Sequence, residues 1–136
     1  MAVALLSVGL LGLLVFLLGF NVSRERNSVL LTQGEAEAAP NSSLRKAIRA
    51  HGNCIEYAPM LALLILALGL RMPLVPKWVA ALMLIAVASR FIHALGVILG
   101  ESIYSATPLK FIGALGTYIS GAALSVVLVV RAASLF

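Results

Sequence analysis

Four long apolar runs alternate with shorter polar segments along this chain. The first run, from Met1 to about Val22, is interrupted only by Ser7 and Asn21. A helix needs roughly 20 mostly apolar residues to cross the hydrocarbon core of a bilayer. The pattern therefore predicts four transmembrane helices, over about residues 1–22, 44–70, 78–99 and 108–130.

The polar segments between these runs indicate where the helices begin and bend. We expect Ser23–Arg45 to form the longest loop, because it is rich in charged and polar residues. The second helix should be capped by one of three residues with short polar side chains, which are Asn41, Ser42 and Ser43. Pro59 lies within the second run and is expected to kink that helix or to loosen its hydrogen bonding.

The composition of the chain supports a location in the membrane. The chain has 136 residues, of which 62% are hydrophobic and 11% are charged. Soluble domains carry about 25% charged residues, so this chain must be solvated by lipid. Its single cysteine, Cys54, excludes an internal disulfide and a multi-cysteine metal site. We expect one domain over residues 1–136, an all-α integral membrane four-helix bundle without a metal.

The net charge of +5 indicates membrane topology rather than a nucleic-acid partner. The predicted first and third loops carry or adjoin Arg24, Arg26, Arg45, Lys46 and Lys110. The opposite side of the bundle carries Arg71, Lys77 and Arg131. The positive-inside rule therefore predicts that the first and third loops are cytoplasmic and that both termini are outside.

One face of the second helix is polar at a depth where polarity is costly. At about 100° per residue, Arg49, Asn53 and Glu56 fall within roughly 60° of one another. Tyr57 lies just beside them. Polar and charged groups inside a bilayer are expensive, and they mark functional sites by default.

The third helix adds a second polar pair, Arg90 and His93, which are three residues apart and so share a face. Glu56 lies about 15 Å from the cytoplasmic end of its helix, and Arg90 lies about 14 Å from the cytoplasmic end of the third. Their matching depths predict an inward-facing Glu56–Arg90 ion pair. Such a pair could belong to a functional site or could serve only to join two helices.

The polar set contains more cations and hydrogen-bonding groups than one glutamate can satisfy. Beyond the Glu56–Arg90 pair it comprises Arg49, Asn53, Tyr57, His93 and Lys110. This excess indicates an anionic ligand, since arginine binds carboxylates through a planar two-pronged fork. Glu56 could accept an ammonium group, so a ligand with carboxylates and an amine fits the mixture.

Three segments resemble a known family. Arg49–Pro59 reads as an arginine, an asparagine four residues on, a glutamate three further, then an aromatic residue and a proline. That order resembles the signature of the MAPEG family, the membrane-associated proteins in eicosanoid and glutathione metabolism. Ser89–Gly96 and, more weakly, Pro108–Gly113 resemble segments of the family's third and fourth helices. The resemblance covers nearly the whole chain and is greatest to short bacterial members.

The resemblance implies a homotrimer in a bacterial inner membrane, with glutathione as co-substrate between adjacent subunits near the cytoplasmic face. Family members conjugate glutathione to lipophilic electrophiles, reduce lipid hydroperoxides or isomerise prostaglandin endoperoxides. By position, the expected glutathione-binding residues are Arg49, Asn53, Glu56, Tyr57, His93 and Arg26. The expected catalytic residues are Arg90 and Lys110, since a nearby cation lowers the pKa of a thiol.

Two positions depart from the family pattern. Lys110 stands where the family has an activating arginine, and Val97 stands where eukaryotic members commonly have a tyrosine. Alternative functions are therefore a non-catalytic membrane protein that binds a thiol or an anionic lipid, and a small four-helix exporter using Glu56. The exporter is disfavoured because a cavity for exporting cations would not normally be lined by Arg49, Arg90 and Lys110.

Several other residues are expected to serve packing. Cys54 points away from the polar face, and His51 should form an interhelical or headgroup hydrogen bond. Gly113, Gly116 and Gly121 lie along the fourth helix, where small residues let helices approach closely.

Overall fold

The computed structural model describes residues 1–33, 41–72 and 74–135, and its described part is entirely helical apart from loops and turns. Its elements are α1 (Ala2–Gln33), α2 (Ser43–Arg71), α3 (Lys77–Leu99) and α4 (Pro108–Ala133). All four helices are long and apolar enough to span a membrane. The prediction of an all-α bundle with four candidate membrane spans is therefore confirmed.

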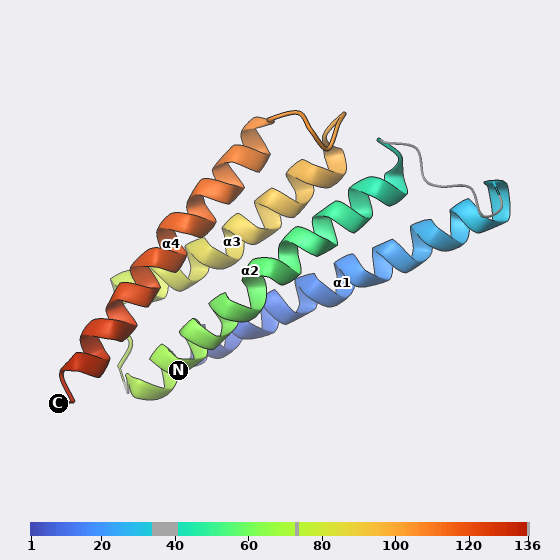
Figure 1. Ribbon diagram of the computed structural model, residues 1–136. Coiled ribbons are helices and arrows are strands. Elements are labelled where there is room, and N and C mark those ends of the chain that lie inside the picture. The colour runs from blue at the N-terminus through green and yellow to red at the C-terminus, as the bar shows by residue number, and fades with distance from the viewer. Residues whose placement is uncertain (34–40, 73, 136) are drawn as a thin grey trace.

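The bundle is open rather than closed into a ring. Successive helices run antiparallel, with α2 and α3 central, α1 packed along α2 and α4 packed along α3 (Figure 1). Within the described residues, α1 and α4 do not contact each other. The chain termini and the α2–α3 turn lie at one end, and the α3–α4 loop and the start of α2 lie at the other.

The first helix is longer than its hydropathy predicts. The apolar run predicts an end near Val22, but α1 continues as a helix to Gln33 and projects beyond its neighbours (Figure 1). The added turns contain the good helix formers Arg24 and Glu25, whose side chains form an ion pair of 2.9 Å. Loss of hydropathy marks where polar residues begin, not where backbone hydrogen bonding stops. The predicted Ser23–Arg45 loop is therefore shorter than expected, and its residues 34–40 lie outside the described part.

The second and fourth helices begin with side-chain caps. Ser42 Oγ accepts a hydrogen bond of 3.3 Å from the backbone N–H of Arg45, which selects Ser42 from the three predicted caps. Thr107 Oγ1 accepts one of 3.4 Å from Lys110 N at the start of α4. Such caps satisfy backbone donors that a helix start leaves without partners. Pro59 lies inside α2, which remains one helix from Ser43 to Arg71.

Close approach of α3 and α4 depends on glycine. A Cβ atom added to Gly113 would lie 2.5 Å from the backbone nitrogen of His93, and one added to Gly116 would overlap Ser89 Oγ. Real Cβ atoms do not approach other atoms so closely, so these two glycines set the spacing of the helix pair. Gly121 instead faces α2, where an added Cβ would meet Leu61 at 3.4 Å. The expectation of close packing is confirmed most strongly at Gly113 and Gly116.

Candidate functional site

Arg90 lies at the centre of the candidate site and joins three helices. Its side chain is 1% exposed. Nη2 donates to the side-chain oxygen of Asn53 at 2.7 Å and to the backbone oxygen of Asn53 at 3.2 Å. Nη1 donates to Thr117 Oγ1 at 3.4 Å, while Nε has no partner among the described residues. The guanidinium group of α3 therefore holds the middle of α2 and α4 in register.

Two tyrosines extend this network towards the bundle surface. The guanidinium carbon of Arg90 lies 5.3 Å from the centroid of the Tyr57 ring, a distance typical of a cation–π contact. The Tyr57 and Tyr118 hydroxyls lie 3.2 Å apart, within hydrogen-bonding distance. Their rings meet edge to face, with centroids 5.7 Å apart and an interplanar angle of 66°. Tyr118 is more than half exposed, so the phenol pair leads from the buried arginine to the outside.

The predicted Glu56–Arg90 ion pair is absent. Within the described residues the one ion pair lies on α1, and Glu56 is exposed. Cys54 faces the core, and at about 100° per residue Asn53 lies about 100° away from it and Glu56 about 160°. The amide of Asn53 can therefore reach α3, whereas the carboxylate of Glu56 points outward from the bundle.

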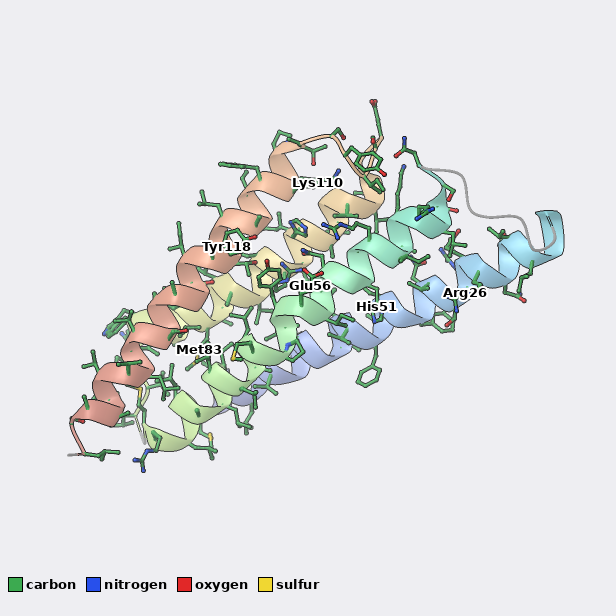
Figure 2. All side chains as sticks on the ribbon, viewed as in Figure 1. Arg26, His51, Glu56, Met83, Lys110 and Tyr118 are labelled. Atoms are coloured by element: carbon green, nitrogen blue, oxygen red, sulfur yellow. The ribbon has the colours of Figure 1, made fainter. Side chains whose placement is uncertain are left out.

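Arg49 and Glu56 form the outward part of the α2 polar face. Both side chains are exposed, and neither forms a side-chain hydrogen bond or an ion pair with another described residue. Glu56 lies close to the midpoint of the 29-residue α2, as Figure 2 shows. A cation and an anion on this face are therefore available to groups outside the chain.

Lys110 is engaged with the α3–α4 loop. Its ammonium group donates to the backbone oxygen of Ser102 at 2.6 Å and to that of Ser105 at 2.8 Å. Figure 2 shows Lys110 at the start of α4, beside this loop. An ammonium group has three N–H donors, so one remains after the two carbonyls are satisfied. Lys110 thus anchors the loop while keeping one donor.

His93 and Asn41 form further hydrogen bonds at the α3–α4 loop and the start of α4. His93 Nδ1 lies 3.0 Å from the backbone oxygen of Lys110, and because a carbonyl only accepts, Nδ1 carries the proton in this bond. Asn41 Oδ1 accepts from Ser102 Oγ at 3.1 Å and from the backbone N–H of Ile103 at 3.3 Å. The loop is therefore held from both the α2 start and the α4 start.

The remaining residues singled out from the sequence lie elsewhere. Arg26 is exposed on the projecting part of α1 and lies far from Glu56 and Lys110 in Figure 2. His51 packs against α1, since a Cβ on Gly19 would lie 3.3 Å from its Nε2. Cys54 is fully buried and free, as expected for a packing residue. Within one chain, the polar residues of α2, α3 and α4 therefore lie near one another, whereas Arg26 lies apart from them.

Sequence reasoning missed the contribution of α4 to the network. Thr117 was not singled out, because a threonine in a helix ordinarily bonds its own backbone, as its 2.7 Å bond to the Gly113 oxygen shows. Tyr118 carried a signal, being a phenol within an apolar run. Beside it a groove of about 160 Å³ separates α2 from α4. Its lining includes Tyr57, Met60, Leu64, Tyr118, Ala122 and Ser125.

A family model described as the MAPEG family matches residues 4–130, which include most of all four helices. The chain belongs to the MAPEG family. The comparison with curated proteins found no match, and the comparison with solved structures found none either. In this MAPEG protein the α2 motif divides into two parts. Asn53 and Tyr57 face Arg90, whereas Arg49 and Glu56 face outward.

Proposed function

We propose that this MAPEG protein is a glutathione-dependent membrane enzyme, a transferase or peroxidase that acts on lipophilic electrophiles. The observation that carries the proposal is the exposed pair Arg49 and Glu56, which has no partner among the described residues. A charged side chain at the centre of a membrane helix costs about 2.5–3.5 kcal/mol on insertion scales. Opposite charges from a ligand or another subunit would offset that cost.

Glutathione has the chemistry that this face can complement. The guanidinium group of Arg49 can bind a carboxylate through two parallel hydrogen bonds. The carboxylate of Glu56 can accept the ammonium group of the ligand. Asn53, Tyr57 and His93 supply further hydrogen-bonding groups beside them, with Asn53 and Tyr57 already oriented by Arg90. A tripeptide with carboxylates, an amine and a thiol therefore finds a partner for one carboxylate at Arg49 and a partner for its amine at Glu56.

The site in this proposal lies between subunits of a homotrimer. Arg49 and Glu56 point away from their own bundle, so a neighbouring copy could cover the bound tripeptide. Arg26 is remote from the site within one chain and would contribute from that neighbouring copy. The α1–α2 and α3–α4 loops would face the cytoplasm of a bacterial inner membrane, with both termini outside, following the charge asymmetry of the loops.

The proposed chemistry begins with loss of the thiol proton. Positive charge from Arg90 and the spare N–H of Lys110 would stabilise the thiolate, which is the reactive form of the thiol. In a transferase, the sulfur lone pair forms a bond to an electrophilic carbon, and the leaving group departs with its bonding pair. In a peroxidase, two thiols become a disulfide while a hydroperoxide becomes an alcohol and water. The apolar groove between α2 and α4 offers the electrophile a path from the lipid.

A second candidate is a membrane protein that binds the thiol without turnover. The observation that favours it is the engagement of Lys110 by two loop carbonyls, which draws its charge towards the loop. Val97, buried on α3, offers no hydroxyl to a thiolate. Binding would then depend on the same Arg49 and Glu56, and only the chemical step would be lacking.

The test is calorimetric titration of detergent-purified protein with glutathione. We expect wild-type binding that is abolished by Arg49→Ala and by Glu56→Gln. Arg71→Ala is the matched control, because Arg71 is an exposed arginine at the other end of the same helix. Turnover of a chromogenic aryl halide or a lipid hydroperoxide then separates the enzyme from the binding protein. Absence of wild-type glutathione binding would overturn both candidates.

A further inference from the structure

A second groove lies at the end of the bundle opposite Lys110. It runs between the start of α3 and the last turns of α4, and its volume is about 350 Å³. Its lining consists of Trp78, Val126, Val127, Val130, Arg131 and Ser134. Ligand pockets in proteins range from about 300 to 1,000 Å³, so the groove can hold part of a small amphiphile.

The groove lies beside the last turns of α4, where fewer residues of the helix are buried. Gly113 and Gly116 hold the first half of α4 against α3. Leu124 is the last buried residue of α4, and beyond it Val126 and Val130 are each 62% exposed. An apolar wall therefore faces outward beside the α3 start, without another described element to cover it.

The polar end of the groove is cationic. Arg131 is exposed, and its side chain forms no ion pair with a described residue. The antiparallel topology brings Arg71 and Lys77 to the same end, since α2 ends and α3 begins there. The described carboxylate side chains all lie towards the middle of the bundle or its other end, and they are Glu25, Glu56 and Glu101. An anion at this end therefore meets positive charge that is not neutralised by a carboxylate side chain of the described chain.

We propose that this groove binds an anionic phospholipid, with the phosphate at Arg131 and an acyl chain along Val126 and Val130. A guanidinium group matches a phosphate through paired hydrogen bonds. Basic residues at a membrane surface attract anionic lipids by about fivefold in affinity for each residue. Trp78 suits the boundary between the headgroups and the hydrocarbon, where tryptophan is enriched. The site shares no residue with the proposed glutathione site.

The lining of the groove includes its own reporter. Trp78 is the single tryptophan of the chain, so its fluorescence reports contact with lipid at one position, beside this groove. The experiment reconstitutes the full chain in vesicles and compares quenching by acyl-brominated phosphatidylglycerol and phosphatidylcholine of equal chain length. We expect the anionic lipid to be preferred at least fivefold, and Arg131→Gln to reduce that preference about fivefold.

Arg71→Gln is the matched control, because Arg71 is a cation at the same end that does not line the groove. It should reduce the preference less than Arg131→Gln does, because it leaves the paired hydrogen bonds to the phosphate in place. Equal quenching by both lipids, or an unchanged preference in Arg131→Gln, would overturn the proposal. Relief of quenching by millimolar inorganic phosphate would indicate a free-anion site instead. Absence of quenching by either lipid would show that another copy of the chain covers the groove. Glutathione titration of Arg131→Gln should match wild type, which keeps this result separate from the proposed function.

Discussion

The side-chain oxygen of Asn53 lies 2.7 Å from Nη2 of Arg90, so a neutral amide holds the buried guanidinium group of this protein. A carboxylate in that place would cancel the arginine's charge. An amide orients the arginine and leaves its full positive charge within the bundle. In a medium of low dielectric constant that charge acts over longer distances than it would in water. In the proposed mechanism, Arg90 would therefore favour a thiolate outside the bundle without touching it.

The Asn53–Arg90 contact predicts a large stability difference between two substitutions. Asn53→Leu removes the side-chain acceptor of a buried guanidinium group, and we expect it to destabilise the protein by about 3 kcal/mol. Asn53→Asp keeps an acceptor at the same place and should retain most of the stability, while neutralising the field of Arg90. Thermal unfolding in detergent measures the first effect, and thiolate absorbance of bound glutathione measures the second. Equal stability of Asn53→Leu and wild type would contradict this role.

The spacing of α3 and α4 predicts opposite outcomes for two glycine substitutions on one helix. Gly113→Ala places a methyl group 2.5 Å from the backbone nitrogen of His93 and should cost about 1–3 kcal/mol through forced separation of the helices. Gly121→Ala meets Leu61 at 3.4 Å, which a small shift accommodates, and alanine is the better helix former. We expect Gly121→Ala to be neutral or stabilising. Thermal unfolding of both variants decides the point, and similar losses in both would refute it.

Filling the α2–α4 groove is expected to weaken binding of the lipophilic substrate selectively. Ala122→Phe should fill much of the roughly 160 Å³ beside Tyr118. We expect the KM for a long-chain electrophile to rise about tenfold, since misfit in an apolar pocket costs about 1–3 kcal/mol. The affinity for glutathione should fall much less, because Arg49 and Glu56 lie outside the groove lining and only Tyr57 belongs to both. Ala114→Phe, elsewhere on α4, is the control. A matching loss of glutathione affinity would show that the two sites are not separate.

Lys110 is expected to act both on the loop and on the thiol. Lys110→Met removes two hydrogen bonds to the Ser102 and Ser105 carbonyls, so amide hydrogen exchange should accelerate in residues 100–107. Lys110→Arg retains the charge and the donors, and should preserve thiolate absorbance that Lys110→Met loses. If both variants keep the thiolate signal, Lys110 positions the loop only.

The sequence was sufficient to predict the number and placement of the helices, because apolar runs of this length are typical of membrane-spanning helices. It was not sufficient to predict where α1 ends. The segment after Val22 is polar yet strongly helix-forming, and hydropathy reports only the first of these properties. Helix propensity of Arg24 and Glu25 was the available signal.

Helical periodicity alone could not predict which residue of α2 binds Arg90. Asn53 and Glu56 share a face that spans roughly 60°, and both lie at a suitable depth. The choice between them depends on how α2 is rotated against α3, which is set by the packing of Cys54 and its buried neighbours. Rotation of this kind depends on side-chain volumes across several helices. The Thr117 contact has the same origin, since it requires α4 to approach at the spacing that Gly113 permits.

The open arrangement of the helices has a consequence for symmetry. With α1 and α4 out of contact within the described residues, each subunit presents two unlike edges. Copies that join the α1 edge of one to the α4 edge of the next would make a head-to-tail interface, whereas copies that join like edges would make a two-fold interface. Head-to-tail interfaces close into rings when the rotation between copies divides a full turn. An assembly built from unlike edges would therefore be cyclic, with three subunits as the smallest such ring.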